Sequence, residues 1–268
     1  ALATAIKLWP VVLLPSLLAA ARRRSVAVVY AGIGGVLALA TVAAAGPARL
    51  WSPLTYQADR GLQIESVAAT PAMVAWWLLP GPWTVAYAPS KAFEITGPGV
   101  EVLLASSTLA TVAYGAGLVV LWSRLWRQRT LTSPPTWLWC GLTAVLGFMV
   151  TGKVLSPQYL LWLLPVAAAG LSVVPGGALR RWSVALVVAA ALTQVVFPHG
   201  YAAITLGLGS PTVPVLALAT RNVLLVLLLG SAAAASWRSL GRDRDPQRGS
   251  ADERQPPGPV DHEPRTAR

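Results

Sequence analysis

Long uninterrupted apolar segments are the dominant feature of this sequence. They run over residues 2–21, 26–46, 100–122, 136–151, 159–175, 183–198 and 213–236. A helix needs about 20 apolar residues to cross the hydrocarbon core of a bilayer, and a backbone in lipid must satisfy its hydrogen bonds internally. The pattern therefore predicts an all-α, polytopic membrane protein with about seven transmembrane helices, of which the fourth to sixth are short and tilted or bent.

The charge content of the chain agrees with this class. Hydrophobic residues make up 55% of the sequence and charged residues only 12%, far too few for the surface of a water-soluble domain. The net charge of +11 comes from short basic clusters between the apolar segments, so membrane topology explains it and we expect no nucleic-acid partner. The chain begins with Ala1 inside an apolar run, without the features of a signal peptide, and we expect a fragment that lacks an N-terminal part.

The basic clusters alternate regularly with the apolar segments. One side receives the arginines at 22–24, at 124, 127 and 129, and at 180 and 181, and also those of the tail. Because cytoplasmic loops are enriched in Lys and Arg, this pattern predicts an extracytoplasmic N-terminus and a cytoplasmic C-terminus in the plasma membrane.

Two non-spanning regions follow from this topology. Residues 47–99 form a large extracytoplasmic loop, in which the segment 66–79 is too short to span and predicts a re-entrant or interfacial helix. Residues 1–237 then form the transmembrane domain. Residues 238–268 are rich in Arg, Asp, Pro, Gly and Ser, and we expect them to be a disordered cytoplasmic tail.

Polar side chains gather on the predicted outer side. The segment 49–71 is the only polar stretch of any length between the apolar segments. Ionisable groups at membrane depth are costly unless paired or hydrated, so each is a functional candidate. The candidates are Lys7, Asp59, Arg60, Gln63, Glu65, Lys153, Gln158, Tyr159, His199, Tyr201 and Arg221.

Several of these residues also have a purely structural explanation. Lys7 fits a side chain that snorkels to the outer surface, and Asp59 with Arg60 fits a local surface pair. Glu65 fits a favourable charge at a helix N-terminus, and Lys153 fits an ordinary charged loop. The sequence leaves both explanations open for each residue.

Arg221 is a separate case, because it lies deep in the last apolar segment and needs a partner that the sequence does not identify. The sequence contains no P-loop, no paired metal-binding cysteines or histidines and no nucleophile elbow. It also contains no clear internal repeat of the kind found in inverted-repeat transporters. We therefore expect neither a cofactor nor a metal.

Three motifs together resemble a known family. They are AIKLWPVVLLP at 5–15 followed by the arginines at 22–24, RGLQIES at 60–66, and GKVLSPQYLLWLLP at 152–165. They are similar to the actinobacterial polyprenyl-phosphate-mannose-dependent mannosyltransferases, GT-C type integral membrane enzymes of glycosyltransferase family 87. The resemblance covers roughly residues 1–236, and it places the chain in the C-terminal part of such an enzyme.

The resemblance implies a hexosyltransferase that moves mannose from a polyprenyl-phosphate donor to an extracytoplasmic glycolipid or glycan acceptor. Such a transfer needs a carboxylate to accept the proton of the acceptor hydroxyl, and cations to stabilise the departing phosphate. The cations expected to bind the donor phosphate are Lys7, Arg60 and Lys153. The side chains expected to line the sugar or phosphate pocket are Gln63, Glu65, Gln158 and Tyr159.

The chain departs from the family pattern in two places. The catalytic aspartate of the family lies in the first extracytoplasmic loop, a segment that we expect this chain to lack. Asp59 is then a weak candidate for the general base, and the fragment need not be active alone. Some relatives carry a histidine pair after the late Ser-Pro, where this chain has Gln158 and Tyr159, so a role of those histidines in phosphate binding would fall to Lys153.

Two other function classes remain open. In a transporter or flippase of a lipid-linked or anionic solute, Lys7 and Arg221 would line the path. The polar residues cluster on one side rather than through the bilayer, which favours an interfacial active site. A non-catalytic membrane scaffold is the third possibility.

Overall fold

The computed structural model describes residues 9–14, 23–58, 60–127, 133–174 and 176–244. Most of these residues are helical. In chain order, the helical elements are η1 (Trp9–Leu13), α3 (Arg23–Ala45), α4 (Ala48–Ala58), α5 (Thr70–Leu78), α6 (Val100–Arg127), α7 (Pro134–Thr151), η2 (Pro157–Tyr159), α8 (Leu160–Val173), α9 (Gly177–Gln194), η3 (Val195–His199), α10 (Tyr201–Thr205) and α11 (Thr212–Arg244). Two strands, β1 (Thr84–Tyr87) and β2 (Phe93–Thr96), lie between α5 and α6.

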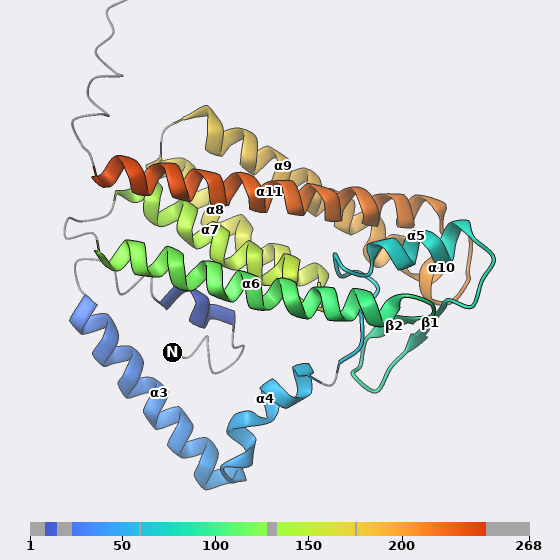
Figure 1. The fold of residues 1–268 in the computed structure, drawn as a ribbon, viewed down its shortest axis with the longest axis horizontal. Coiled ribbons are helices and arrows are strands. Elements are labelled where there is room, and N and C mark those ends of the chain that lie inside the picture. The colour runs from blue at the N-terminus through green and yellow to red at the C-terminus, as the bar shows by residue number, and fades with distance from the viewer. Residues whose placement is uncertain (1–8, 15–22, 59, 128–132, 175, 245–268) are drawn as a thin grey trace, which may run out of the picture.

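The helices α6, α7, α8, α9 and α11 lie side by side and form a bundle (Figure 1). Helix α7 is its centre, since it packs against α6, α8 and α11, and its Leu142, Leu146 and Met149 are buried. Gly147 allows the Tyr114 ring of α6 to lie against α7, where the Tyr114 hydroxyl donates a hydrogen bond to the carbonyl oxygen of Ala144. The core therefore depends on apolar side chains that meet across neighbouring helices.

Four helices of the described residues are long and apolar enough to cross a membrane. They are Arg24–Ala45, Val100–Arg127, Gly177–His199 and Thr212–Asp243, and they correspond to the predicted segments 26–46, 100–122, 183–198 and 213–236. The segments 136–151 and 159–175 form α7 and α8, which have 18 and 14 residues, and most of 2–21 lies outside the described residues. The chain is thus mostly helical with four membrane-compatible helices, whereas the count of seven spans and the orientation stay predictions.

The bundle has two chemically different ends (Figure 1). At one end α6 finishes with Arg124 and Arg127, and α9 begins close to Arg180 and Arg181. At the other end lie α5, α10, the β1–β2 hairpin and the connector between α7 and α8. This second end, called the hairpin end below, contains the polar segments that the sequence singles out.

Helix α3 lies apart from the bundle in Figure 1. Its large apolar side chains are exposed, among them Val28, Val36 and Leu39. A helix with apolar residues on all sides is typical of a membrane span, which agrees with its place among the four membrane-compatible helices.

The hairpin is a departure from the predicted all-α fold. Strands β1 and β2 pair in antiparallel fashion, with Val85 opposite Ile95. The turn between them contains no glycine, and Lys91 adopts the left-handed conformation at φ 59°. A turn without glycine gives a weak sequence signal, so the sequence predicts only a loop here.

Two helix boundaries also differ from expectation. Helix α5 begins at Thr70 rather than at 66, with Pro71 in its first turn, a position that proline favours. Helix α11 continues to Arg244, past the expected start of the tail at 238. Leu240 is buried there and the Asp243 carboxylate accepts a hydrogen bond from the backbone N–H of Ser133, so tertiary contacts hold this last stretch of helix. The remaining tail, 245–268, lies outside the described residues.

Candidate functional site

The segment 60–66 crosses the hairpin end beside strand β2, with an isolated β-bridge between Gln63 and Glu94 and a turn at Ile64 and Glu65. Ile64 donates its backbone N–H to the carbonyl oxygen of Phe93 at 3.1 Å, and Ile95 donates to the carbonyl oxygen of Leu62 at 3.0 Å. Leu62 and Ile64 are buried in the apolar cluster that also contains Met73. The side chains of Gln63 and Glu65 make their polar contacts elsewhere, with the α7–α8 connector and with α11 respectively.

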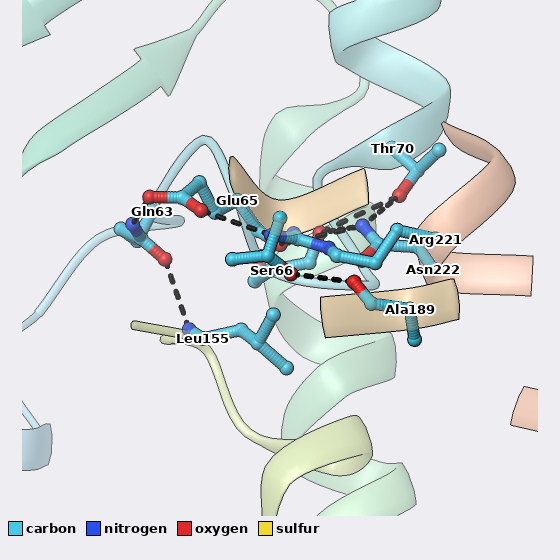
Figure 2. A network of polar contacts seen from close by, with 9 residues as sticks. Gln63, Glu65, Ser66, Thr70, Leu155, Ala189, Arg221 and Asn222 are labelled. Carbon is cyan, nitrogen blue, oxygen red and sulfur yellow. Dashed lines mark hydrogen bonds and ion pairs between the residues drawn. The ribbon is translucent and has the colours of Figure 1, made fainter. Parts of the chain in front are cut away.

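Gln63 joins the segment 60–66 to the α7–α8 connector. Its backbone N–H donates to the carbonyl oxygen of Lys153 at 3.1 Å. Its side-chain Oε1 accepts from the backbone N–H of Leu155 at 2.9 Å, as Figure 2 shows. Two segments that the sequence singles out independently are thus in direct contact.

Glu65 forms an ion pair with Arg221 of α11 (Figure 2). The distance between Arg221 Nη1 and Glu65 Oε2 is 3.0 Å. Arg221 also donates from Nη2 to the backbone carbonyl oxygen of Glu65 at 2.7 Å, and from Nε to Asn222 Oδ1 at 3.0 Å. The exposed fractions of the two residues are 0% for Arg221 and 1% for Glu65, so each nitrogen of the guanidinium has a partner away from solvent.

Asn222 extends these contacts between Glu65 and α11 to the start of α5. Its Nδ2 lies within hydrogen-bond distance of the carbonyl oxygens of Glu65 and Ser66, at 3.3 and 3.2 Å. It is closest to Thr70 Oγ1, at 2.7 Å (Figure 2). Gln63, Glu65, Arg221 and Asn222 are called the inner network below.

Burial determines the electrostatics of the inner network. Burial raises the pKa of the Glu65 carboxyl above its ordinary value, while the charge and hydrogen bond of Arg221 oppose that rise. Burial together with the negative charge of Glu65 raises the pKa of Tyr201 to about 12, so Tyr201 is a neutral hydroxyl beside the carboxylate. Since a buried ion pair is stable only when all its polar groups are satisfied, the observed geometry fits a structural clamp between segment 60–66 and α11.

A second polar cluster lies closer to the surface and is organised around Ser90. The Ser90 carbonyl oxygen accepts hydrogen bonds from Arg60 Nη2 at 3.1 Å and from the Tyr56 hydroxyl at 2.5 Å. The Ser90 hydroxyl donates to Glu94 Oε1 at 2.5 Å. A side chain at Gly61 would collide with the Glu94 carboxylate, which therefore lies against the segment 60–66. Tyr56, Arg60, Ser90 and Glu94 are called the polar rim below.

The polar rim retains an unused donor. Within the described part of the chain, the buried Nε of Arg60 has no hydrogen-bond partner. The guanidinium lies 5.2 Å from the centre of the Tyr56 ring, and its charge acts on Tyr159 of the connector. Among the described residues Arg60 forms no ion pair, and its half-buried positive charge is suited to attract an anion such as a phosphate.

The predicted site residues lie in different parts of the hairpin end, or outside the described residues. Gln63 and Glu65 belong to the inner network and bind other parts of the chain. Arg60 lies in the polar rim, and Lys153 and Tyr159 lie half-buried in the adjoining connector, where Tyr159 stacks on Trp162 with ring centres 4.1 Å apart. Gln158 is exposed, while Lys7 and Asp59 lie outside the described residues.

Some residues of the site were not predicted from the sequence. The sequence does not mark Ser90, Glu94 or Asn222 as site residues, because a serine, a loop glutamate and an asparagine beside an arginine carry no specific sequence signal. Arg221 was selected, and Glu65 is the partner that the sequence could not identify. In the described ranges, no three His, Cys, Asp or Glu side chains gather closely enough to hold a metal ion.

Comparison of the chain with known proteins gives no significant match to a protein-family model, a curated protein or a solved structure.

Proposed function

We propose that this chain belongs to a membrane glycosyltransferase that moves a hexose, mannose, from a polyprenyl-phosphate donor to a glycan or glycolipid acceptor outside the cytoplasmic membrane. The observation that carries the proposal is the contact between segment 60–66 and the α7–α8 connector through Gln63. This contact brings the cations Arg60 and Lys153 to the end of the bundle that also carries the Glu94 carboxylate.

The reaction requires two kinds of group, and the hairpin end has candidates for both. The acceptor hydroxyl oxygen forms a bond to the anomeric carbon, and the bond from that carbon to the phosphate oxygen breaks. The polyprenyl phosphate leaves with the electron pair, and the hydroxyl proton passes to a carboxylate. Arg60 and Lys153 would stabilise the departing phosphate with their positive charges.

Glu94 is the residue that we propose as the proton acceptor. Its carboxylate is half-buried and accepts a hydrogen bond from the Ser90 hydroxyl. The backbone carbonyl oxygen of the same serine accepts a hydrogen bond from Arg60. Glu65 does not suit this role, because Arg221 occupies its carboxylate away from solvent. A carboxylate within reach of both acceptor and solvent is what general-base catalysis requires.

The proposal can be tested with the full-length protein, purified together with its lipids and supplied with polyprenyl-phosphate-[14C]mannose and a glycolipid acceptor extract. Arg60→Gln and Lys153→Gln should each reduce label transfer by about 100-fold or more, and Glu94→Gln by about 100-fold to 10,000-fold. Lys91→Gln and Glu101→Gln are matched controls, since both charges are exposed at the same end of the bundle.

Two results would reject this function. One is the absence of transfer from any polyprenyl-phosphate sugar by the folded wild-type protein. The other is a loss of transfer in the control variants as large as that in the variants of the site. If the label is instead taken up or flipped across the membrane of reconstituted liposomes, the protein is a transporter.

A further inference from the structure

Two surface segments at the hairpin end expose leucine side chains. Leu78 and Leu79 at the C-terminal end of α5 have exposed fractions of 58% and 56%. Leu206 and Leu208, in the turn between α10 and α11, have exposed fractions of 64% and 67%. These four residues are called the apolar edge below. So many large apolar side chains gathered on a surface indicate contact with something other than water.

Hydrogen bonds link the two segments that carry the apolar edge. The indole N–H of Trp77 donates to the Thr212 hydroxyl at 3.1 Å, and Ser210 donates to the same hydroxyl at 3.2 Å. These bonds connect the last turn of α5 to the turn that carries Leu206 and Leu208. Figure 1 shows α5 beside the α10–α11 region at this end of the bundle.

The sequence around the apolar edge is free of charge. Residues 67–90 and residues 200–220 contain no Asp, Glu, Lys or Arg. Exposed loops in water usually carry charged side chains of both signs. The absence of charge from both segments, which are far apart in the sequence and adjacent in the fold, indicates a shared apolar environment.

We propose that the apolar edge inserts into the acyl-chain region of one membrane leaflet, so that phospholipid rather than water covers this end of α5 and the α10–α11 turn. The edge is continuous with α11, where Val213 and Leu216 are also exposed and which is one of the membrane-compatible helices. A surface that continues the lipid-facing side of a span is expected to contact the same lipid.

The polar groups behind the apolar edge fit the headgroup boundary of a bilayer. Trp77 and Trp83 are half-buried, and the indole N–H of Trp83 donates to the carbonyl oxygen of Pro98 at 3.2 Å. Tryptophan is enriched at this depth because its ring is apolar and its N–H is polar. The backbone N–H groups of Leu79 and Leu208 donate to Ala75 and Ala202, which lowers the cost of moving these residues out of water.

The test measures the depth of single spin labels in the membrane. Leu79→Cys and Leu208→Cys are made separately in a Cys140→Ala background, labelled with a nitroxide and reconstituted into phosphatidylcholine–phosphatidylglycerol vesicles at about 3:1, a mixture with an anionic surface. Accessibility to oxygen and to nickel-EDDA gives the depth of each label, calibrated with phospholipids that carry nitroxides along the acyl chain. Lys91→Cys, on the exposed hairpin turn, is the matched control for a position in water.

We expect the labels at 79 and 208 to be accessible to oxygen and protected from nickel-EDDA, at a depth below the phosphate groups. The label at 91 should show the opposite. Nickel-EDDA accessibility at 79 and 208 equal to that at 91 would overturn the proposal. Protection from both reagents, or dipolar broadening between labels of two molecules, would also overturn it, because a protein partner or a second copy would then cover the edge. None of these readouts depends on the proposed transferase activity.

Discussion

The inner network and the polar rim lie at the same end of the bundle, yet their arginines differ in burial and in hydrogen-bond partners. In the inner network, Arg221 and Glu65 neutralise each other at full burial, and every nitrogen of the guanidinium is paired. In the polar rim, Arg60 is half-buried and keeps an unpartnered Nε within the described residues. The difference separates a charge that holds the fold together from a charge that is available to a ligand.

The inner network and the polar rim should respond differently to the loss of a charge. Loss of a charge in the inner network leaves its partner buried and unpaired, which is expensive in a protein interior. Loss of a charge in the polar rim exposes the remaining groups to solvent or headgroups, which satisfy them at little cost. Variants of the two regions should therefore differ in the free energy of unfolding before any activity is considered.

The largest effect is expected for Arg221→Leu. The variant leaves the Glu65 carboxylate and the Glu65 carbonyl oxygen without their main donors in a buried site. We expect a loss of about 3–5 kcal/mol in the free energy of unfolding, measured by reversible unfolding in mixed detergent micelles. Arg180→Gln, an exposed arginine at the opposite end of the bundle, should change the same quantity by less than about 0.5 kcal/mol.

The double variant Glu65→Leu/Arg221→Leu decides whether the loss comes from the unpaired charge. Removal of both charges leaves no ion buried alone, and apolar replacements of a buried pair are often tolerated. The double variant should therefore be more stable than Arg221→Leu. If it is less stable by the sum of the two single effects, the pair is not coupled and the structural role of the clamp is rejected.

A smaller effect is expected for Gln63→Leu. The variant removes the acceptor of the Leu155 backbone N–H, and a buried N–H without a partner costs about 1–3 kcal/mol. The same unfolding measurement, with the exposed Gln158→Leu as the control, tests this value. Hydrogen exchange should show faster exchange of the Leu155 amide in Gln63→Leu than in the wild type. Unchanged exchange there would mean that Gln63 does not hold the connector.

The sequence predicts the long helices of the molecule but not the contacts between its polar segments. The long helices were predictable, because an apolar run of the right length is a local signal that a bilayer or a core can satisfy in only one way. The motif RGLQIES and the connector GKVLSPQY were singled out as separate candidates, and the structure shows that Gln63 joins them. Their contact could not be derived, because periodicity does not tell which helices are neighbours.

The partner of Arg221 is a clearer example of a contact that the sequence does not determine. Arg221 clearly required a partner, yet Glu65 lies 156 positions earlier in the chain, and the sequence contains other carboxylates at the predicted outer side. Only the packing of α5 against α11 selects between them. The hairpin was missed for a local reason, because Lys91 occupies the turn position that glycine or asparagine usually marks.

The smallest stability effect is expected in the polar rim, for Arg60→Gln. The variant removes one hydrogen bond to the Ser90 carbonyl oxygen and the contact with the Tyr56 ring. For a partly exposed cation these contacts amount to about 0.5–1 kcal/mol, and Tyr56 still donates to the same carbonyl oxygen.

The unfolding measurement on Arg60→Gln bears directly on the comparison of the two regions. If the variant costs as much free energy as Arg221→Leu, Arg60 is a second structural clamp, and its unpartnered Nε has no bearing on ligand binding. A small cost leaves the fold intact, so that a loss of sugar transfer in the same variant reports on the donor phosphate itself. The rim would then act on the ligand because, unlike the inner network, it does not hold the fold together.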